Sequence, residues 1–599
     1  MLEAMLGTRE RCPSDESQIP GGDARRLAMF FLLGWMSILG CSPGPAKQHS
    51  VSSKDVPSKV PAINSSKESG QTPEKASSRF LLEDRSKQLE LNFAYQNDED
   101  SGLLSIVESL GGGVAVFDFD KDGNQDVMAA GGGTFENKST TRGVACGLFR
   151  NSGTRFESVT AMATVVTELY SHGVCVADYN HDGYGDVLIT GYNGLVLLEN
   201  MGDGTFQHRP DNGFPVEPGW CTSAAWADFN QDGALDLYVA RYVDWSFSNH
   251  PVCYSSVNGE RDICPPKSFL PLPDLLLISN QHGRFLESAN RNGLRKDGKG
   301  LGVLAVDIDN DSDIDVYVAN DTTDNFLYLN DGVGQFNEVG LLHGVAVDDR
   351  SIPNGSMGVA AGDFDENGWI DLWVTNYERE SNAMYQNQGQ GLFQHVSRRV
   401  GVTTMGGGFV GFGTEFCDLD MDGRSEILVT NGHVVRFPSA APLRQLPLIL
   451  TLQDGRFIKQ FFPSENYFGA EHQGRGLATG DMNGDGTVDV VISHLSEPVA
   501  LLMNSTVPVS PPFAFQLVGS ESNRDAIGAR VVARIGETEI NRQIVGGGSY
   551  LSTSERTIRI PTFGSSKCSL KIYWPGQSTP QLLDITSQDG VVTIVQPLP

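Results

Sequence analysis

The chain of 599 residues carries 74 acidic and 44 basic side chains, which gives a formal net charge of −30 at pH 7. A protein this acidic is poorly suited to bind the phosphate backbone of nucleic acids, so no nucleic-acid partner is expected. Long helical patterns are scarce, and beyond residue 39 no apolar stretch is long enough to cross a bilayer.

The N-terminal region has the pattern of an export signal. Arg25 and Arg26 precede an apolar run, Leu27 to Leu39, which is too short for a stable membrane anchor and is typical of a signal peptide. The Gly-Cys pair that follows resembles a bacterial lipobox. Residues 1–41 are therefore predicted to be a signal peptide with a lipobox, and Cys41 to become the lipidated N-terminus. Ordinary secretion, with Cys41 incidental, is the alternative.

Residues 42–86 are rich in serine, lysine and proline and contain few apolar side chains. A segment of this composition cannot bury a core, so it is predicted to be a flexible tether. The protein is expected to be exported to the cell envelope, in the periplasm or at the cell surface, and to meet a membrane only through its lipid anchor.

An acidic loop of nine residues returns seven times between apolar runs, at intervals of 50 to 79 residues. Acids or amides occupy positions 1, 3 and 5, glycine usually occupies position 6, and an acid occupies position 9. Calcium takes about six to eight oxygen ligands, and such a loop supplies them around a sharp turn. The sequence therefore predicts structural calcium sites with these ligands: Asp118, Asp120, Asp122 and Asp126; Asp178, Asn180, Asp182 and Asp186; Asp228, Asn230, Asp232 and Asp236; Asp307, Asp309, Asp311 and Asp315; Asp363, Asp365, Asn367 and Asp371; Asp418, Asp420, Asp422 and Glu426; Asp481, Asn483, Asp485 and Asp489.

Two loops depart from the common pattern. The fourth has Ser312 at position 6, where a residue with positive φ would cost serine more than glycine. The sixth closes with Glu426, whose longer side chain can change how it binds a metal. The alternative for all seven is a set of metal-free hairpin turns, but clusters of three or four uncompensated carboxylates repel one another.

Each loop belongs to a unit that reads strand, acidic hairpin, strand, strand, glycine turn, strand. The second half of the unit is an apolar pair, Asn, a Gly turn and Phe, as in Leu327 to Asn330 followed by Phe336. Four antiparallel strands per unit indicate a propeller blade, and seven units suit a closed ring. The fold class predicted is all-β: a seven-bladed β-propeller over residues 87–511, followed by a small C-terminal β-rich domain over residues 512–599.

The seventh unit lacks its last strand, because Asn504 is followed directly by a proline-rich stretch. Leu89 to Tyr95 precedes the first loop and has no partner in its own unit. This N-terminal segment is predicted to complete the last blade and so to latch the ring.

The longest gap between loops holds an insertion from Tyr242 to Pro273. Cys253 and Cys264 flank its polar part, and a disulfide between them is expected in an oxidising compartment. Tyr242, Trp245, Phe247 and Tyr254 are candidate contacts for a partner, or else they pack beneath their own loop.

The acidic loops resemble the calcium loops of FG-GAP/VCBS repeats, the type found in the propellers of integrin α-subunits. Gly111 to Asp118 is similar to forms seen in the ASPIC/UnbV group. The C-terminal stretch resembles the terminal domain of that group, in Asn523 to Ala529, Arg542 to Gly548, Tyr550 to Ser552 and Trp574 to Gly576. The resemblance implies a calcium-binding propeller with a terminal β domain, and it implies no particular activity.

No motif of a nucleophile, dinucleotide site or zinc site is found where its structural context would fit. The predicted function is adhesion or recognition of an envelope or extracellular protein or glycan by a calcium-binding propeller. The alternative is an extracytoplasmic enzyme that acts on polysaccharide at the mouth of the ring, where His433 and His472 are the residues to consider first.

Overall fold

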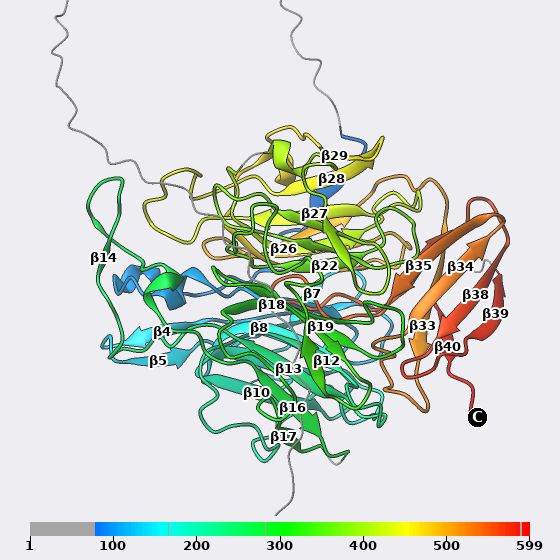
Figure 1. Ribbon diagram of the computed structural model, residues 1–599, viewed down its shortest axis with the longest axis horizontal. Helices are drawn as coiled ribbons and strands as arrows, with labels where there is room; N and C mark the ends of the chain where they lie inside the picture. Colours follow the sequence, from blue (N-terminus) through cyan, green and yellow to red (C-terminus); the bar gives the residue numbers. More distant parts are fainter. Residues whose placement is uncertain (1–77, 166, 282, 406, 587–589, 599) are drawn as a thin grey trace, which may run out of the picture. The chain divides into compact units, whose positions relative to one another are not determined.

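The computed structural model describes residues 78–598 except 166, 282, 406 and 587–589 (Figure 1). The predicted signal peptide, Cys41 and residues 42–77 lie outside the described residues. Strands dominate the described residues, whose helices are five short 3₁₀ turns: η1 (Glu99–Ser101), η2 (Ile106–Ser109), η3 (Pro266–Ser268), η4 (Val402–Met405) and η5 (Tyr467–Gly469). Within the described part of the chain, no helix has the length and apolar character needed to cross a membrane.

Seven sheets built from the repeated units each contain four antiparallel strands, which confirms the predicted all-β fold. The first three consist of β2 (Val114–Phe117), β3 (Asp126–Ala129), β6 (Gly147–Asn151) and β7 (Phe156–Ser158); β8 (Tyr170–Ala177), β9 (Asp186–Tyr192), β10 (Gly194–Asn200) and β11 (Phe206–His208); and β12 (Cys221–Ala227), β13 (Asp236–Arg241), β16 (Leu275–Ser279) and β17 (Phe285–Glu287).

The remaining four sheets follow the same order. They consist of β18 (Gly300–Val306), β19 (Asp315–Asn320), β20 (Phe326–Asn330) and β21 (Phe336–Glu338); β22 (Val359–Gly362), β23 (Asp371–Val374), β24 (Ala383–Asn387) and β25 (Phe393–His395); β26 (Gly411–Cys417), β27 (Glu426–Asn431), β28 (Leu448–Gln453) and β29 (Arg456–Lys459); and β30 (Gly474–Gly480), β31 (Asp489–His494), β32 (Ala500–Asn504) and β1 (Leu82–Asp84).

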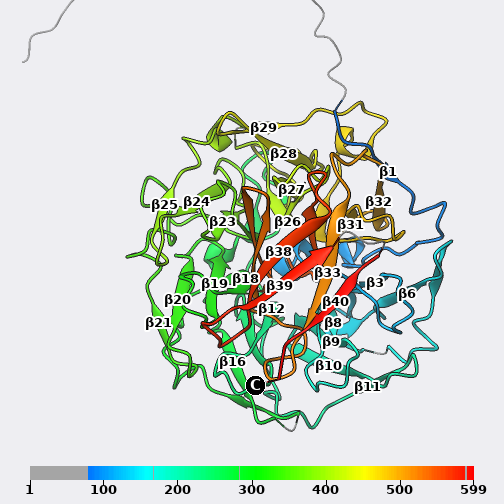
Figure 2. The ribbon, with the colours of Figure 1, turned by 90° about the vertical axis from the view of Figure 1, so that its right-hand side faces the viewer.

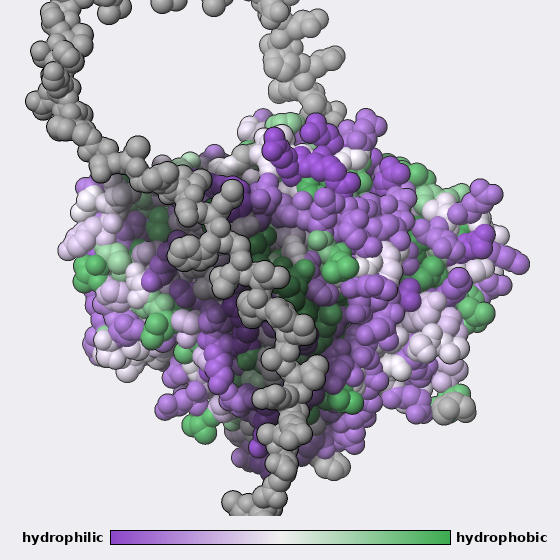
Figure 3. Space-filling view, in the orientation of Figure 1, coloured by the Kyte–Doolittle hydropathy of each residue, from purple (hydrophilic) through white to green (hydrophobic). Residues whose placement is uncertain are grey.

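The sheets stand side by side around an axis, as Figure 2 shows, and the first strand of each unit is innermost. The inner strands β2, β8, β12, β18, β22, β26 and β30 each lie next to the following one, and β30 lies next to β2. Most residues of these strands are buried, β8 and β12 along their whole length, because each faces a neighbouring sheet on both sides. Polar residues cover most of the surface drawn in Figure 3.

The last sheet is completed from the N-terminus as predicted, but by a different strand. β1 pairs with β32 through Leu82, Glu83 and Asp84 opposite Asn504, Met503 and Leu502. The predicted latch over residues 89–95 is therefore wrong, and so is the boundary that placed residues 78–86 in the tether. Leu82 is fully buried, so a strand of three residues suffices to close the sheet.

The segment predicted as the latch instead seals the joint between the last and first sheets. Leu91 is buried among apolar residues of both sheets. The backbone of Leu89 accepts a hydrogen bond from Phe156 N–H at 2.7 Å, and that of Phe93 accepts one from Val499 N–H at 2.8 Å. The apolar residues of segment 89–95 therefore pack between two sheets, and the segment is not a strand of either sheet.

Two short hairpins extend from the ring: β4 (Gly133–Glu136) with β5 (Thr140–Gly143), and β14 (Cys253–Tyr254) with β15 (Arg261–Asp262). In Figure 1 both lie on the left, on the side away from the C-terminal strands. Each hairpin follows the second strand of its unit and therefore leaves the ring at the end opposite the acidic loops.

The C-terminal module, residues 512–598, packs two sheets around a core that includes Trp574, which is 1% exposed. One sheet joins β37, β33 and β40, and the other joins β35, β34, β38 and β39. Their bounds are β33 (Pro512–Val518), β34 (Arg530–Ile535), β35 (Thr538–Gln543), β37 (Ile558–Pro561), β38 (Lys567–Tyr573), β39 (Gln581–Thr586) and β40 (Val592–Val595).

Between β35 and β37 the chain leaves the module and enters the ring. In this hub segment, residues 546–554, β36 (Gly546–Gly547) pairs with β18 as a fifth strand. Tyr550 is fully buried. Hydrogen bonds join the segment to the inner strand of every sheet, through Val114, Val174, Ser223, Val303, Val359, Thr414 and Leu477.

Candidate metal sites

All seven acidic loops lie at one end of the ring, here called the loop face, because each connects an inner strand to the strand that runs back beside it. The opposite end is called the mouth face. In every loop the first aspartate is the residue that organises the turn. Its two carboxylate oxygens accept the N–H groups of positions 5 and 6, at donor–acceptor distances between 2.8 and 3.2 Å.

The closing acid of each loop is buried and is also held by the backbone. Asp371, for example, accepts the N–H of Phe364 at 3.0 Å with one oxygen and that of Asn387 at 2.7 Å with the other. Burial raises the pKa of Asp126 to about 8 and the pKa values of Asp186 and Asp371 to about 9. A nearby cation would favour the ionised form of these carboxyl groups.

The third position provides the test of whether a metal fits. Asp120, Asp309, Asp365 and Asp420 each have one carboxylate oxygen that is buried and, among the described residues, has no hydrogen-bond partner. An unpaired buried oxygen is costly unless an ion or a water satisfies it. Carboxylate oxygens gather closely in the four loops that carry these residues, at Asp118, Asp120 and Asp122; Asp307, Asp309 and Asp311; Asp363, Asp365 and Asp371; and Asp418, Asp420 and Glu426.

The remaining loops, the second, third and seventh, have asparagine at the third position, and its amide bonds to the fifth-position aspartate. The distance from Asn180 Nδ2 to Asp182 Oδ2 is 3.1 Å, that from Asn230 to Asp232 is 3.3 Å and that from Asn483 to Asp485 is 2.9 Å. The assignment of the 28 residues as metal ligands stays a prediction. These three loops and the fifth, which has Asn367, each offer three carboxylates, whereas the first, fourth and sixth loops offer four.

In two loops the acidic ligands form ion pairs with an arginine from elsewhere in the ring. Arg150 Nε lies 2.6 Å from Asp120 in the first loop. At the sixth, Arg79 contacts Asp420 at 3.0 Å and Glu426 at 3.1 Å. Arg79 thus holds the Glu426 oxygen that a backbone N–H of the third strand holds in other loops.

Sequence reasoning missed the residues that join neighbouring loops. Asn387 in β24 donates from Nδ2 to the carbonyl of Ile370 at 3.0 Å and to that of Ile308, in the preceding loop, at 2.9 Å. The recurring Asn of the second motif was the available signal, but it was interpreted only as part of a strand before a turn. The same link to the preceding loop is made by Asn151, Asn200, Asn330 and Asn504.

The C-terminal module covers the loop face. Arg524 lies 3.4 Å from Asp178, and Arg559 lies 3.6 Å from Asp481, each of which is the first aspartate of a loop. Gln543 contacts the first aspartate of the fourth loop. Much of the loop face is therefore occupied by the protein itself.

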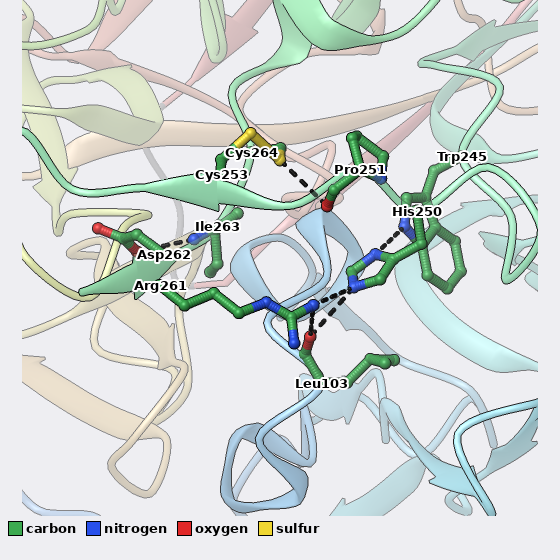
Figure 4. The surroundings of a disulfide bond; sticks show 9 residues. All are labelled: Leu103, Trp245, His250, Pro251, Cys253, Arg261, Asp262, Ile263 and Cys264. Atoms are coloured by element: carbon green, nitrogen blue, oxygen red, sulfur yellow. Dashed lines mark hydrogen bonds between the residues drawn. A yellow bond between two sulfur atoms is a disulfide. The ribbon is translucent and has the colours of Figure 1, made fainter. Parts of the chain in front are cut away.

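The mouth face carries the disulfide predicted from the cysteine spacing. Cys253 and Cys264 are bonded with an S–S distance of 2.06 Å, at the base of the β14–β15 hairpin (Figure 4). Below it, Trp245 Nε1 donates to His250 Nδ1 at 3.0 Å, and His250 Nε2 lies 3.2 Å from the carbonyl of Leu103 and 2.8 Å from Arg261 Nη2.

The four aromatic candidates of this insertion divide between packing and exposure. Tyr242 and Trp245 are buried, and Phe247 packs partly against the same core. Tyr254 is 69% exposed. One of the four is therefore open to a partner.

The two histidines considered for catalysis are enclosed. His433 is fully buried, with Nε2 3.3 Å from Glu378, and burial lowers its pKa. His472 Nδ1 lies 2.9 Å from Glu497, and its ring stacks on Tyr467. Neither is presented to a substrate as it stands.

A different set of residues at the mouth face includes a carboxyl group with an altered pKa. Asp321, at the end of β19, accepts a hydrogen bond from Tyr242, and burial raises its pKa to about 6. Glu380 lies nearby, and its charge contributes to that rise. No periodic pattern predicts this group, because its members come from separate segments between strands.

Comparison with known proteins agrees with the architecture. The model of the FG-GAP-like repeat matches residues 118–189, 178–239, 307–374 and 363–429, and that of ASPIC and UnbV matches residues 519–597. Cartilage acidic protein 1 of Mus musculus is 23% identical over 496 residues, covering 71% of this chain and 74% of its own. The protein of the same name from Homo sapiens is 22% identical over 505 residues, covering 71% and 72%.

Among solved structures, an Agrocybe aegerita lectin described as recognising non-reducing terminal N-acetylglucosamine aligns with a TM-score of 0.36 and 16% identity, over 66% of this chain and 95% of its own. The BP39L lectin of Burkholderia pseudomallei aligns with a TM-score of 0.30 and 11% identity, over 80% and 97%. The repeats and the terminal domain are matched by their family models, and the chain is therefore a protein of FG-GAP-like repeats joined to a C-terminal ASPIC and UnbV domain.

Proposed function

We propose that this chain is an exported, calcium-stabilised recognition module, held at the cell envelope by a lipid on Cys41, that binds a protein or glycan with its mouth face. The observation that carries the proposal is the division of the ring into two unequal faces. The C-terminal module occupies the loop face, whereas the mouth face carries long insertions on a rigid scaffold. Binding residues are commonly placed on loops of this kind.

Calcium is the cation that suits the loops. Their ligands are carboxylate and amide oxygens, which hard cations prefer. A bound cation would also satisfy the buried oxygens that have no hydrogen-bond partner among the described residues, at Asp120, Asp309, Asp365 and Asp420. Calcium bound there would neutralise the loops and hold the two strands of each hairpin together. The Cys253–Cys264 disulfide supports export, because such bonds persist in oxidising compartments.

The exposed β14–β15 hairpin, with the residue that precedes it, is the part of the mouth face best suited to a partner. Val252, Tyr254 and Val257 are 57%, 69% and 59% exposed, and the disulfide restrains the base of the hairpin. Exposed aromatic and aliphatic side chains on a restrained element lose little entropy on binding.

The test is capture of partners from an envelope extract by the immobilised chain, first with calcium and then with chelator. We expect a partner that is retained with calcium and lost with chelator, and retained less by Tyr254→Ala. Leu582→Ala is the matched control, because Leu582 is 72% exposed on the C-terminal module. A partner that depended on Leu582 and not on Tyr254 would contradict the assignment of the mouth face.

A second candidate is hydrolysis of a polysaccharide at the mouth face, favoured by one observation. Asp321 has a raised pKa near neutrality and lies beside Tyr242 and Glu380, a combination that can serve general acid catalysis. Envelope polysaccharides incubated with the chain and with Asp321→Asn would separate the candidates. Release of reducing ends by the former alone would support an enzyme, and release by neither would leave recognition as the function.

A further inference from the structure

The fourth acidic loop departs from the others at a point of backbone strain. Ser312 takes the place of glycine and has φ of 79°, in the left-handed region that costs a residue with a side chain. The loop nonetheless forms the same turn, with Asp307 accepting the N–H groups of Asp311 and Ser312 at 3.1 Å each. Something else must offset the strain.

The C-terminal module holds this loop at the strained residue. The carbonyl of Ser312 accepts the N–H of Gly576 at 3.3 Å, and its hydroxyl donates to the carbonyl of Gln577 at 3.4 Å. These contacts hold the carbonyl of Ser312 and the hydroxyl of its side chain. The turn at residues 576–577 of the module therefore stabilises the strained backbone conformation of Ser312.

The module also holds the loop at its first ligand. Gln543 Nε2 donates to the carbonyl of Asp307 at 2.9 Å, and Gln543 Oε1 accepts the N–H of Asp307 at 3.3 Å. This two-point clamp fixes the backbone of Asp307, whose side chain organises the whole turn. Asp309 in the same loop has a buried oxygen without a partner.

We infer that the C-terminal module completes the fourth cation site, with Gln543 and the turn at residues 576–577 as its positioning residues. The inference rests on the proposed binding of calcium by the loops. The module makes the fourth loop competent despite Ser312, and by reciprocity a cation in this loop strengthens the docking of the module. Oxygen ligands that are already held in position bind a cation more tightly than mobile ones. Loss of the Gln543 clamp is therefore expected to weaken cation binding at the fourth loop.

Other loops provide an internal comparison. Asp525 accepts the N–H of Asp178 at 3.0 Å, and Glu555 accepts that of Asp481 at 3.0 Å. These two loops keep glycine at the sixth position, so they depend less on support from the module. In the fourth loop the N–H of the first aspartate likewise donates to the module, at Gln543, and the sixth position is the strained Ser312.

The test is calorimetric titration of calcium into the full chain after removal of metal by chelation. Gln543→Ala is expected to weaken one ion equivalent about tenfold, the effect of one or two lost hydrogen bonds, and to leave the others unchanged. Ser312→Gly in the Gln543→Ala background is expected to restore most of that affinity, because it removes the strain. Gln516→Ala is the matched control, since Gln516 belongs to the module and bonds to Thr557.

The outcomes distinguish the two levels of the argument. If the unaltered chain binds no calcium, the proposed role of the loops fails and the inference fails with it. If the chain binds calcium and Gln543→Ala binds it identically, the inference fails while the role of the loops stands. If Gln543→Ala weakens all sites together and Ser312→Gly restores nothing, Gln543 is merely structural and the inference is overturned.

Discussion

Replacing Asn387 by alanine should cost the protein about 3 kcal/mol of unfolding free energy. The side chain is fully buried and takes part in three hydrogen bonds: Nδ2 to Ile308 O at 2.9 Å, Nδ2 to Ile370 O at 3.0 Å, and Gly389 N–H to Oδ1 at 2.9 Å. Each such bond contributes about 1 kcal/mol net, and the carbonyls left behind have no access to water. Asn387→Asp should cost more, because a carboxylate would face two carbonyl oxygens.

The measurement is urea unfolding followed by tryptophan fluorescence at saturating calcium, with the difference in midpoint converted through a common slope. Asn258→Ala is the control, since this exposed asparagine only accepts a local bond from Glu260 N–H and its loss should cost less than about 0.5 kcal/mol. If Asn387→Ala unfolded together with the control, or if Asn387→Asp matched the unaltered protein, the idea that these asparagines tie neighbouring loops would be refuted.

Four further predictions concern the metal sites, the closing strand, the disulfide and a buried histidine. Chelation should lower the unfolding temperature, because a site occupied at 100 times its dissociation constant adds about 2.7 kcal/mol; an unchanged temperature would count against metal in the loops. A chain that begins at residue 87 should be several kcal/mol less stable than one that begins at residue 78, since it lacks the closing strand β1 with its buried Leu82 and also the buried Phe80 that precedes it; equal denaturation midpoints would disprove this. Reduction of Cys253–Cys264 should cost about 3 kcal/mol on the loop-closure model, and retention of full stability in reductant would argue against it. Burial lowers the pKa of His172 to about 3, so below about pH 6.5 the unfolded chain takes up this proton and the folded chain does not. This residue alone should therefore lower stability by about 1.4 kcal/mol for each pH unit of acidification. His172→Gln should be less sensitive to acid than the unaltered protein between about pH 6.5 and 5 by this amount, and parallel profiles would exclude the effect.

The sequence allowed the fold to be predicted because its signals are local and repeated. Each acidic loop and the strands beside it lie within about twenty residues, so one register could be recognised seven times. The pairing of Cys253 with Cys264 was accessible for the same reason, since a short polar insertion separates them.

What was missed depends on contacts between residues far apart in the chain. Leu82–Asp84 is too short to show an alternating pattern, and its partner β32 lies more than 400 residues away. The glycines at residues 546–548 look like a turn because nothing local shows that they enter the ring. The Asn387 link was overlooked because its acceptor, Ile308, belongs to the preceding sheet.

The hub segment has a consequence for the order in which the protein matures. A ribosome makes residues 546–554 after all seven sheets, and yet they supply hydrogen bonds to the inner strand of each. A nascent chain that has finished its repeats still lacks the central strand that they share. The ring therefore reaches its final form only after nearly the whole polypeptide has been synthesised, so its inner strands stay incompletely hydrogen-bonded until then.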